Sequence, residues 1–210
     1  MAGGSLAKGW SAYALTDNEA SSGGSAGNDL ITTEYGNDQF AGDSMAIETG
    51  NEIGEETSAY THNDAYSNST AGSDEILTGY GHDIGAGDSA EFALGEYGHA
   101  DAYTYNTCWG EGAEAGNDTI TTGYGDDTVA GGSLAKGWSA HAETHNATFD
   151  SEASAGSDEI TTGYGNDQFA GDSMAIETGD IGEPNAWTWN TSGNAGGEAG
   201  TDCILSGYGN

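Results

Sequence analysis

Large aliphatic residues are sparse in this chain, and they recur at long and nearly constant intervals. One series of isoleucines illustrates the spacing: Ile31, Ile76, Ile120, Ile160 and Ile204. Around such positions the patterns D-x-I-x and D-x-F-A alternate polar and apolar residues, which is typical of a strand that buries one face. Alternation of aromatic residues and threonine in AYTYNT (102–107) and AWTWNT (186–191) predicts further strands. No segment shows an apolar stripe of 3.6-residue period, so we expect almost no helix.

The element A-G-x-D divides the chain into repeats. Its glycines are 45, 44, 40 and 44 residues apart, and each of the first four elements is followed by the isoleucine, a Tyr-Gly pair, a second aspartate and an A-G-D/G-S element. A longer period lies above this one, because AGGSLAKGWSA (2–12) recurs at 130–140 and NDQFAGDSMAIET (37–49) recurs at 166–178. Three repeats therefore form a larger duplicated unit. Such self-similarity is the signature of a repeat architecture.

We expect residues 1–210 to form a single repeat array, cut as a window from a longer array and without capping repeats. The predicted coils are approximately 1–26 (partial), 27–71, 72–115, 116–155, 156–199 and 200–210 (partial). Cys108 and Cys203 fall on different parts of the repeat and are not expected to form a disulfide framework.

The charge balance limits what the chain can bind. There are 35 acidic residues against 2 basic ones, Lys8 and Lys136, and the formal net charge is −33. Nucleic acid and anionic membrane would be repelled, and both are excluded as direct partners. No apolar run is long enough to cross a membrane. Self-repulsion also opposes a compact state, so disorder is the alternative for the cation-free chain, whereas a folded chain is expected when cations lie among the acids.

Aspartate and glycine side by side suit calcium. This ion takes six to eight oxygen ligands at about 2.3–2.6 Å. Glycine lets the backbone turn tightly, and the short aspartate offers a carboxylate from the same turn. One turn supplies about half a coordination shell, so the remainder is expected from the equivalent turn of the next coil, about 4.8 Å away. The pattern therefore predicts several Ca²⁺ ions along columns of aspartates.

Two columns are predicted, with a third as a weaker candidate. The A-G-x-D turns supply Asp29, Asp74, Asp118, Asp158 and Asp202. The Tyr-Gly turns supply Asp38, Asp83, Asp127 and Asp167. The weaker column, which Gly4 and Gly132 interrupt, contains Asp43, Asp88 and Asp172. Two bare carboxylates at the coil spacing repel by about 1 kcal/mol in water and by several at an effective dielectric constant near 20, and a divalent ion between them reverses the sign.

Several segments resemble the RTX (hemolysin-type) calcium-binding nonapeptide, G-x-G-x-D-x-U-x, where U is a large apolar residue. The clearest are TEYGNDQFA (33–41), TGYGDDTVA (122–130) and TGYGNDQFA (162–170); GSAGNDLIT (24–32) and EAGNDTIT (114–121) are looser matches. The resemblance covers less than half of the chain, because inserts of roughly 25 residues separate the pairs. It implies a parallel β-solenoid with calcium in its turns. It also implies export from a Gram-negative cell and folding outside, and thus a secreted or cell-surface location.

Two coil geometries fit these repeats. Either each repeat of about 45 residues forms one large coil, or short RTX coils form and the inserts loop out. We favour the large coil because the inserts themselves have strand patterns. In that geometry the tyrosines of the Tyr-Gly pairs stack as a ladder: Tyr35, Tyr80, Tyr124, Tyr164 and Tyr208. The threonine pairs beside them (Thr32/Thr33, Thr121/Thr122, Thr161/Thr162) are expected to hydrogen-bond along a sheet face.

No catalytic arrangement is found in the sequence, and we expect no enzyme. His141 and His145 have the spacing of a zinc pair on a helix, but their context predicts a strand and exposed polar side chains. The favoured function is a secreted, calcium-dependent structural module that forms a scaffold, surface layer or filament by head-to-tail stacking. The alternative is an adhesin or polysaccharide-binding solenoid that uses Trp10, Trp138, Trp187 and Trp189. Ice binding is less favoured, since tyrosine replaces threonine beside the turn.

Overall fold

A computed structural model describes residues 1–9, 12–48, 56–94, 99–178, 184–193 and 196–207. All regular structure among these residues is β-strand, and every pair of neighbouring strands is parallel. No helix occurs in this part of the chain, so no helix there is long and apolar enough to cross a membrane. The prediction of an all-β parallel solenoid with about five coils is confirmed.

The described strands form five sheets, here named A to E. Sheet A contains β5 (Gln39–Ala41), β10 (Ile84–Ala86), β15 (Thr128–Ala130) and β20 (Gln168–Ala170). Sheet B contains β1 (Ser5–Gly9), β6 (Ser44–Glu48), β11 (Ser89–Ala93), β16 (Ser133–Gly137) and β21 (Ser173–Glu177). Sheet C contains β2 (Tyr13–Ala20), β7 (Glu56–Ala65), β12 (His99–Cys108), β17 (Ser139–Thr148) and β22 (Asn185–Ser192).

The two remaining sheets are built from short strands. Sheet D contains β3 (Ser25–Ala26), β8 (Thr70–Ala71), β13 (Glu114–Ala115), β18 (Ser154–Ala155) and β23 (Glu198–Ala199). Sheet E contains β4 (Leu30–Thr32), β9 (Glu75–Leu77), β14 (Thr119–Thr121), β19 (Glu159–Thr161) and β24 (Cys203–Leu205). The chain passes through sheets B, C, D, E and A in that order and then begins the next coil.

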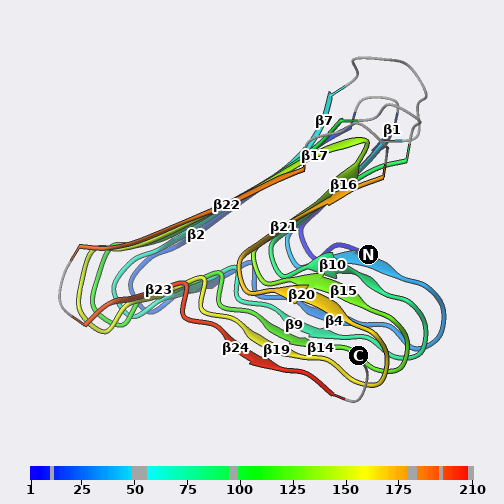
Figure 1. Ribbon diagram of the computed structural model, residues 1–210. Helices are drawn as coiled ribbons and strands as arrows, with labels where there is room; N and C mark the ends of the chain where they lie inside the picture. Colours follow the sequence, from blue (N-terminus) through cyan, green and yellow to red (C-terminus); the bar gives the residue numbers. More distant parts are fainter. Residues whose placement is uncertain (10–11, 49–55, 95–98, 179–183, 194–195, 208–210) are drawn as a thin grey trace.

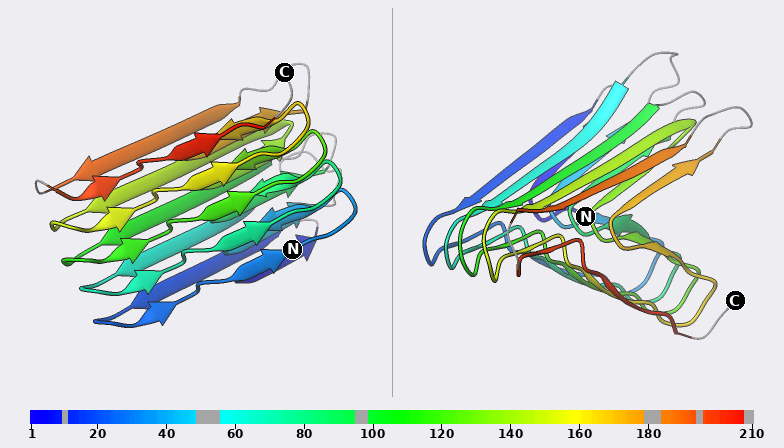
Figure 2. Two further views of the ribbon diagram at one scale, coloured as in Figure 1. Left: turned by 90° about the horizontal axis from the view of Figure 1, so that it is seen from below. Right: turned by 60° about the vertical axis from the view of Figure 1, so that its left-hand side comes forward.

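Each coil has two arms (Figure 1). In one arm the strands of sheet B run beside the longer strands of sheet C, and in the other arm sheets D, E and A return the chain to its starting side. Successive coils stack in chain order, from blue to red (Figure 2). Ser44, Ser89, Ser133 and Ser173 pair with one another in sheet B. The large-coil geometry is therefore confirmed, and the inserts between the RTX-like segments form sheet C.

Differences in coil length are absorbed at the corner between sheets B and C. The strands β16 and β17 are separated there by Trp138 alone, whereas β6 and β7 are separated by residues 49–55. The rest of the coil keeps an unbroken register, so equivalent turns lie directly above one another. This constancy is what places the aspartates in columns.

Two kinds of core hold the coil together. Sheets E and A pack large side chains between them, among which Phe40, Ile76 and Ile120 are fully buried. Sheets B and C are instead packed almost entirely through alanines, such as Ala93, Ala102 and Ala135. Because alanine is small, these two sheets lie close together, and the Ser89 hydroxyl of sheet B donates to the carbonyl of Tyr103 in sheet C at 2.9 Å.

The tyrosines of the Tyr-Gly pairs form the predicted ladder. Ring centroids are 5.2 Å apart for Tyr35 and Tyr80 and 4.9 Å apart for both Tyr80–Tyr124 and Tyr124–Tyr164, with interplanar angles of 8°, 4° and 6°. Tyr208 lies outside the described residues. About half of each ring remains exposed from Tyr80 to Tyr164, so the ladder is an external support along one edge of the solenoid.

Candidate calcium-binding turns

The A-G-x-D turn connects sheet D to sheet E and aims its aspartate into the coil. Its glycine has a left-handed backbone in all five repeats, for example φ = 55° at Gly72 and 57° at Gly116, a conformation that glycine adopts without strain. A Cβ on Gly72 would also lie 2.1 Å from Oδ1 of Asn63. Glycine is thus required for the turn and for the side chain packed against it.

Each aspartate of this column after Asp29 accepts a hydrogen bond from the coil before it. The backbone N–H of Asp29 donates to Oδ1 of Asp74 at 2.7 Å, and the N–H of Asp74 donates to Oδ1 of Asp118 at 2.7 Å. The same bond joins Asp118 to Asp158 at 2.8 Å and Asp158 to Asp202 at 3.1 Å. One oxygen of each accepting carboxylate is therefore used within the protein.

The second oxygen of these carboxylates, Oδ2, takes no part in the bonds between coils. Oδ2 of Asp74, Asp118 and Asp158 is buried and has no hydrogen-bond partner within the described part of the chain. The residues themselves are at most 3 % exposed. An unpartnered buried carboxylate oxygen costs substantial free energy, so these oxygens call for a ligand that is positively charged.

The glycine of the A-G-D/G-S element makes room for this oxygen. A Cβ on Gly87 would lie 2.0 Å from Oδ2 of Asp118 and 2.1 Å from the carbonyl oxygen of Gly131. Gly42, Gly131 and Gly171 have the same relation to Asp74, Asp158 and Asp202, at 1.9, 2.0 and 1.9 Å. The two turns therefore face each other inside the coil, and only glycine permits the approach.

The third predicted column is held by a ladder of asparagines. Asn63 Nδ2 donates to Oδ1 of Asn106 at 3.0 Å and to Oδ1 of Asp88 at 2.8 Å. Its equivalents Asn18 and Asn146 bond in the same way to Asp43 and Asp172, at 2.8 and 2.6 Å. The ladder runs through all five coils: Asn18, Asn63, Asn106, Asn146 and Asn190. Each amide thus fixes one carboxylate and one neighbouring coil.

This third column does not form a separate site. Carboxylate oxygens of Asp29, Asp43 and Asp74 lie within 4.8 Å of one another, and so do those of Asp158, Asp172 and Asp202. Each group combines two successive A-G-x-D aspartates with one aspartate from the facing turn. Its oxygens come from two turns of the coil, whereas the sequence predicted ligands from one column at a time.

Burial changes the acidity of these groups. Loss of solvation raises the pKa of Asp43 to about 7, against the lowering effect of the Asn18 amide. It raises the pKa of Asp172 to about 6, with the charge of Asp202 adding to the shift. Burial also places the pKa values of Asp118 and Asp158 well above their usual range. In each case the protein disfavours the charged carboxylate unless a cation accompanies it.

The Tyr-Gly turns form a second, shallower row. The N–H of Asp83 donates to Oδ1 of Asp127 at 2.9 Å, while Oδ2 of both residues is buried and has no partner among the residues that the structure describes. Burial raises the pKa of Asp127, although the Thr122 hydroxyl lies close enough to lower it. Asp38 and Asp167 continue the row at its two ends, with N–H to Oδ1 distances of 2.9 and 3.0 Å.

The threonines beside this row do not behave as predicted. The hydroxyls of Thr33, Thr78 and Thr122 are buried and have no hydrogen-bond partner among the described residues. The expected hydrogen bonds along a sheet face are therefore wrong for Thr33 and Thr122, because these side chains point into the coil beside the aspartates. Their oxygens add possible neutral ligands to the row.

Sequence reasoning missed the asparagine ladder, although a signal was present. The tripeptide T-x-N occurs once in each repeat, beginning at Thr16, Thr61, Thr104, Thr144 and Thr188. In sheet C the alternation of a strand turns both of its polar residues inward. Two of the four Asn-x-Ser/Thr sequons in the chain, at Asn146 and Asn190, belong to this ladder.

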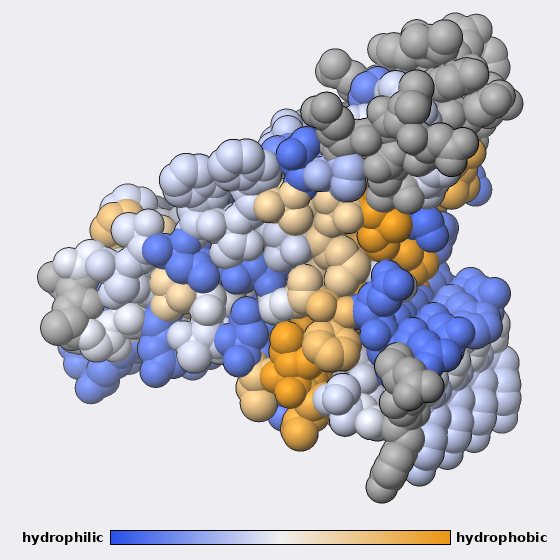
Figure 3. Space-filling view, viewed as in Figure 1, coloured by the Kyte–Doolittle hydropathy of each residue, from blue (hydrophilic) through white to orange (hydrophobic). Residues whose placement is uncertain are grey.

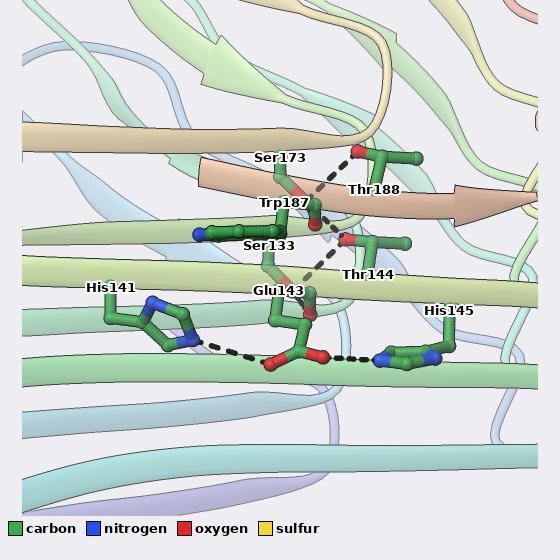
Figure 4. Close-up of polar contacts among 8 residues, drawn as sticks. All are labelled: Ser133, His141, Glu143, Thr144, His145, Ser173, Trp187 and Thr188. Atoms are coloured by element: carbon green, nitrogen blue, oxygen red, sulfur yellow. Dashed lines mark hydrogen bonds and ion pairs between the residues drawn. The ribbon is translucent and has the colours of Figure 1, made fainter. Parts of the chain in front are cut away.

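The histidine pair lies on the outer face of sheet C, on a strand as predicted. Figure 4 shows the carboxylate of Glu143 between the rings of His141 and His145. The Nε2 atoms of both histidines contact Glu143, one at each oxygen, at 3.2 Å for His141. Burial would raise the pKa of Glu143, but the hydrogen bonds to His145 and His141 outweigh it and lower that pKa. The two rings thus face one carboxylate from opposite sides and do not converge on a shared point. Cys108 and Cys203 are both free thiols, as expected.

The fold and its acidic turns define a repeat solenoid of the cation-binding class. A family model for the RTX calcium-binding nonapeptide repeat (4 copies) matches residues 24–44, 113–133 and 152–173, less than a third of the chain. The predicted resemblance is thereby confirmed: the chain carries RTX calcium-binding repeats and is a calcium-binding repeat protein. Comparisons with curated proteins and with solved structures gave no match.

The raised pKa values predict an unusual pH dependence. Between the usual value near 4 and the raised values of about 6 and 7, Asp172 and Asp43 are protonated in the folded chain and ionised in the unfolded chain. Unfolding then releases protons, so stability without calcium should fall as pH rises from 5 to 8, by on the order of a few kcal/mol. Circular dichroism in chelator measures this fall as a loss of β-structure between pH 5 and pH 8. Saturating calcium should abolish it, because the ion replaces the proton. A β-structure signal in chelator that increases with pH would contradict the assignment.

Proposed function

We propose that the chain is a secreted structural module whose coils are joined by calcium ions bound between facing turns. The observation that carries this proposal is the row of buried, unpartnered Oδ2 atoms of Asp74, Asp118 and Asp158. Calcium prefers such hard oxygen ligands. In this proposal the ions lie in two rows, one between the A-G-x-D and A-G-D-S turns and one along the Tyr-Gly turns.

The electrostatics support an ion at each step of the first row. Carboxylates one coil apart repel by about 1 kcal/mol in water and by about 3–4 kcal/mol at an effective dielectric constant of 20. The two basic residues of the chain do not offset 35 acidic ones. Divalent ions are therefore the natural counter-charge, and without them the coils should separate.

The sites of this row are not equivalent. Between most successive A-G-x-D aspartates the sequence has one aspartate of the facing turn, which is Asp43, Asp88 or Asp172. Between Asp118 and Asp158 the equivalent residue is Gly132. That step has one carboxylate fewer. Because ligand charge tunes calcium affinity, we expect it to fill last.

Calcium titration followed by far-ultraviolet circular dichroism tests the central proposal. The chain should pass from coil to β-structure as calcium is added. Asp118→Asn removes a charge at a buried Oδ2 and should raise the calcium midpoint by about tenfold or more. The matched control is Asp126→Asn, because Asp126 is exposed and its Oδ1 accepts the N–H of Asn166 at 2.8 Å, a role that Asn37 fills in another coil. A spectrum that calcium leaves unchanged would refute the proposal.

Secretion follows from the calcium requirement. A chain with this charge is expected to stay unfolded where calcium is scarce and to fold at the millimolar concentrations found outside cells. Folding would then be coupled to arrival outside the cell. The match to RTX repeats supports this location.

We further propose that folded copies stack head to tail. The first and last strands of sheet C, β2 and β22, carry the same inward Ala-x-Thr-x-Asn pattern. A second copy in register would continue the asparagine ladder from Asn190 to Asn18. Apolar side chains gather on the last coil (Figure 3), and Trp187, 52 % exposed, would then cover Leu15, 47 % exposed. Contacts of this head-to-tail kind generate open filaments.

Electron microscopy and sedimentation with calcium test the stacking. Wild-type protein should form filaments or higher oligomers in calcium and lose them in chelator. Trp187→Glu places a charge on the end face and should reduce assembly. Tyr66→Glu makes the same change at an exposed aromatic residue of an inner coil and should have no effect. A wild-type protein that stays monomeric in millimolar calcium would exclude head-to-tail stacking.

A groove on the outer face of sheet C favours polysaccharide binding as a second candidate function. It has a volume of about 830 Å³ and is lined by Tyr13, Leu15, Asp17, Tyr60, His62, Asp64, Tyr105 and Thr107. Aromatic rings suit the apolar faces of sugars, and the carboxylates can accept hydrogen bonds from their hydroxyl groups. Trp187 and Trp189 lie on the same face of the sheet, whereas Trp138 lies at the corner between sheets B and C. Trp10 lies outside the described residues.

A pull-down with neutral and anionic polysaccharides in calcium tests this candidate. Tyr60→Ala should weaken binding several-fold, because Tyr60 lines the groove. Tyr164→Ala, which removes a ring from the ladder on another face, should not. Equal retention of both variants would rule the groove out as the binding surface.

A further inference from the structure

Two glutamates interrupt the alanine core between sheets B and C. Glu48 on β6 and Glu91 on β11 are both 0 % exposed. The alanines around them form two separate clusters, one centred on Ala46 and Ala59 and the other on Ala102 and Ala135. Neither glutamate belongs to the acidic turns described above, since both lie within strands.

The strand register places the two glutamates diagonally across neighbouring strands. Glu91 pairs with Ala46 of the preceding coil, and Glu48 pairs with Ala93 of the following one. Because side chains alternate along a strand, Glu48 and Glu91 share the face of sheet B that is turned toward sheet C. They are diagonal neighbours, a relation that spans about 7–8 Å between backbones and that long side chains bridge. The charge of Glu48 also contributes to the raised pKa of Glu91, after burial and Asp101.

A third oxygen faces this pair from sheet C. The Ser44 hydroxyl bonds the carbonyl of Tyr60 at 2.7 Å, and Ala46 packs in one cluster with Ala59. Two residues further on in sheet B and two residues back in sheet C, Glu48 is therefore opposite Thr57. The Thr57 hydroxyl is fully buried and has no hydrogen-bond partner among the described residues.

The carboxylate of Glu91 needs a ligand. Both of its oxygens are buried, and neither has a hydrogen-bond partner in the described part of the chain. Every other coil has alanine at this position of sheet B: Ala7, Ala46, Ala135 and Ala175. The two lysines of the chain lie on the opposite face of sheet B, because Lys8 and Lys136 align with Ile47 and Phe92. The protein thus supplies no cation for this carboxylate from the strands that surround it.

We propose that Glu91, Glu48 and Thr57 bind a divalent cation in the interior, between sheets B and C. The donors are carboxylate and hydroxyl oxygens, which select a hard ion such as Ca²⁺. The ion would offset the cost of burying the charge of Glu91 and would join the second and third coils on the side away from the turns. This site is distinct from the turn sites, since none of its three residues lies in a turn.

The test compares Glu91→Gln and Glu91→Ala with the wild-type chain. Alanine is the residue of the other four coils, so the second variant is expected to fold. Bound calcium per chain, measured by equilibrium dialysis with elemental analysis, should fall by one ion in both variants. The rise in melting temperature from limiting to saturating calcium should also become smaller. Glu159→Gln, a change at an exposed glutamate, is the control and should alter neither quantity.

Two outcomes would overturn the proposal. One is an unchanged ion count in both variants, which would mean that Glu91 binds no ion and is simply a buried protonated acid. The other is an infrared band of a protonated carboxyl group in calcium-loaded wild-type protein that disappears in Glu91→Gln. Asp118→Asn separates this site from the turns: it should weaken calcium binding there and leave the ion of Glu91 in place.

Discussion

Repulsion between carboxylates that stack in register, one coil apart, is the constraint on which this structure depends. A parallel solenoid repeats each turn at the spacing of neighbouring strands, so an aspartate that recurs in the sequence also recurs in space. The backbone N–H of one coil satisfies Oδ1 of the next, as between Asp74 and Asp118. That bond holds the carboxylate in place, while Oδ2 has no partner in the described part of the chain. The same register that makes the fold regular therefore also creates its need for cations.

Glycine and asparagine residues determine which carboxylate oxygen of each aspartate remains available to a ligand. Gly87 lets Oδ2 of Asp118 approach the facing turn, where any side chain would fill the space. Asn63 and Asn106 hold the carboxylate of Asp88 through their amide groups, at 2.8 and 3.2 Å. An amide is neutral, so it orients the carboxylate without cancelling its charge. The facing turns are therefore arranged for a ligand that the polypeptide itself does not contain.

Much of the fold could be predicted because its signals are strictly periodic. Ile120 and Tyr124 recur at the repeat length, and the structure stacks their columns as expected. The grouping of Asp43 with Asp29 and Asp74 could not be predicted, because it joins turns on opposite sides of a coil whose cross-section the sequence does not specify. The role of Asn106 was hidden within an insert of variable sequence. Glu91 gave no periodic signal, since its column contains alanine in every other coil.

The inward and outward side chains of sheet C have different roles, and this difference explains how the inserts vary without loss of the fold. Inward positions alternate with outward ones along each strand, and in β17 the inward side chains include Thr144 and Asn146, which continue the ladders between coils. The outward positions of the same strand carry His141, Glu143 and His145, whose contacts are with one another and with the rings of neighbouring strands. Because register and cation binding depend on the inward set, the outward set is free to change from coil to coil. The face of sheet C is accordingly the part of the solenoid where a specific surface can arise while the acidic turns stay the same.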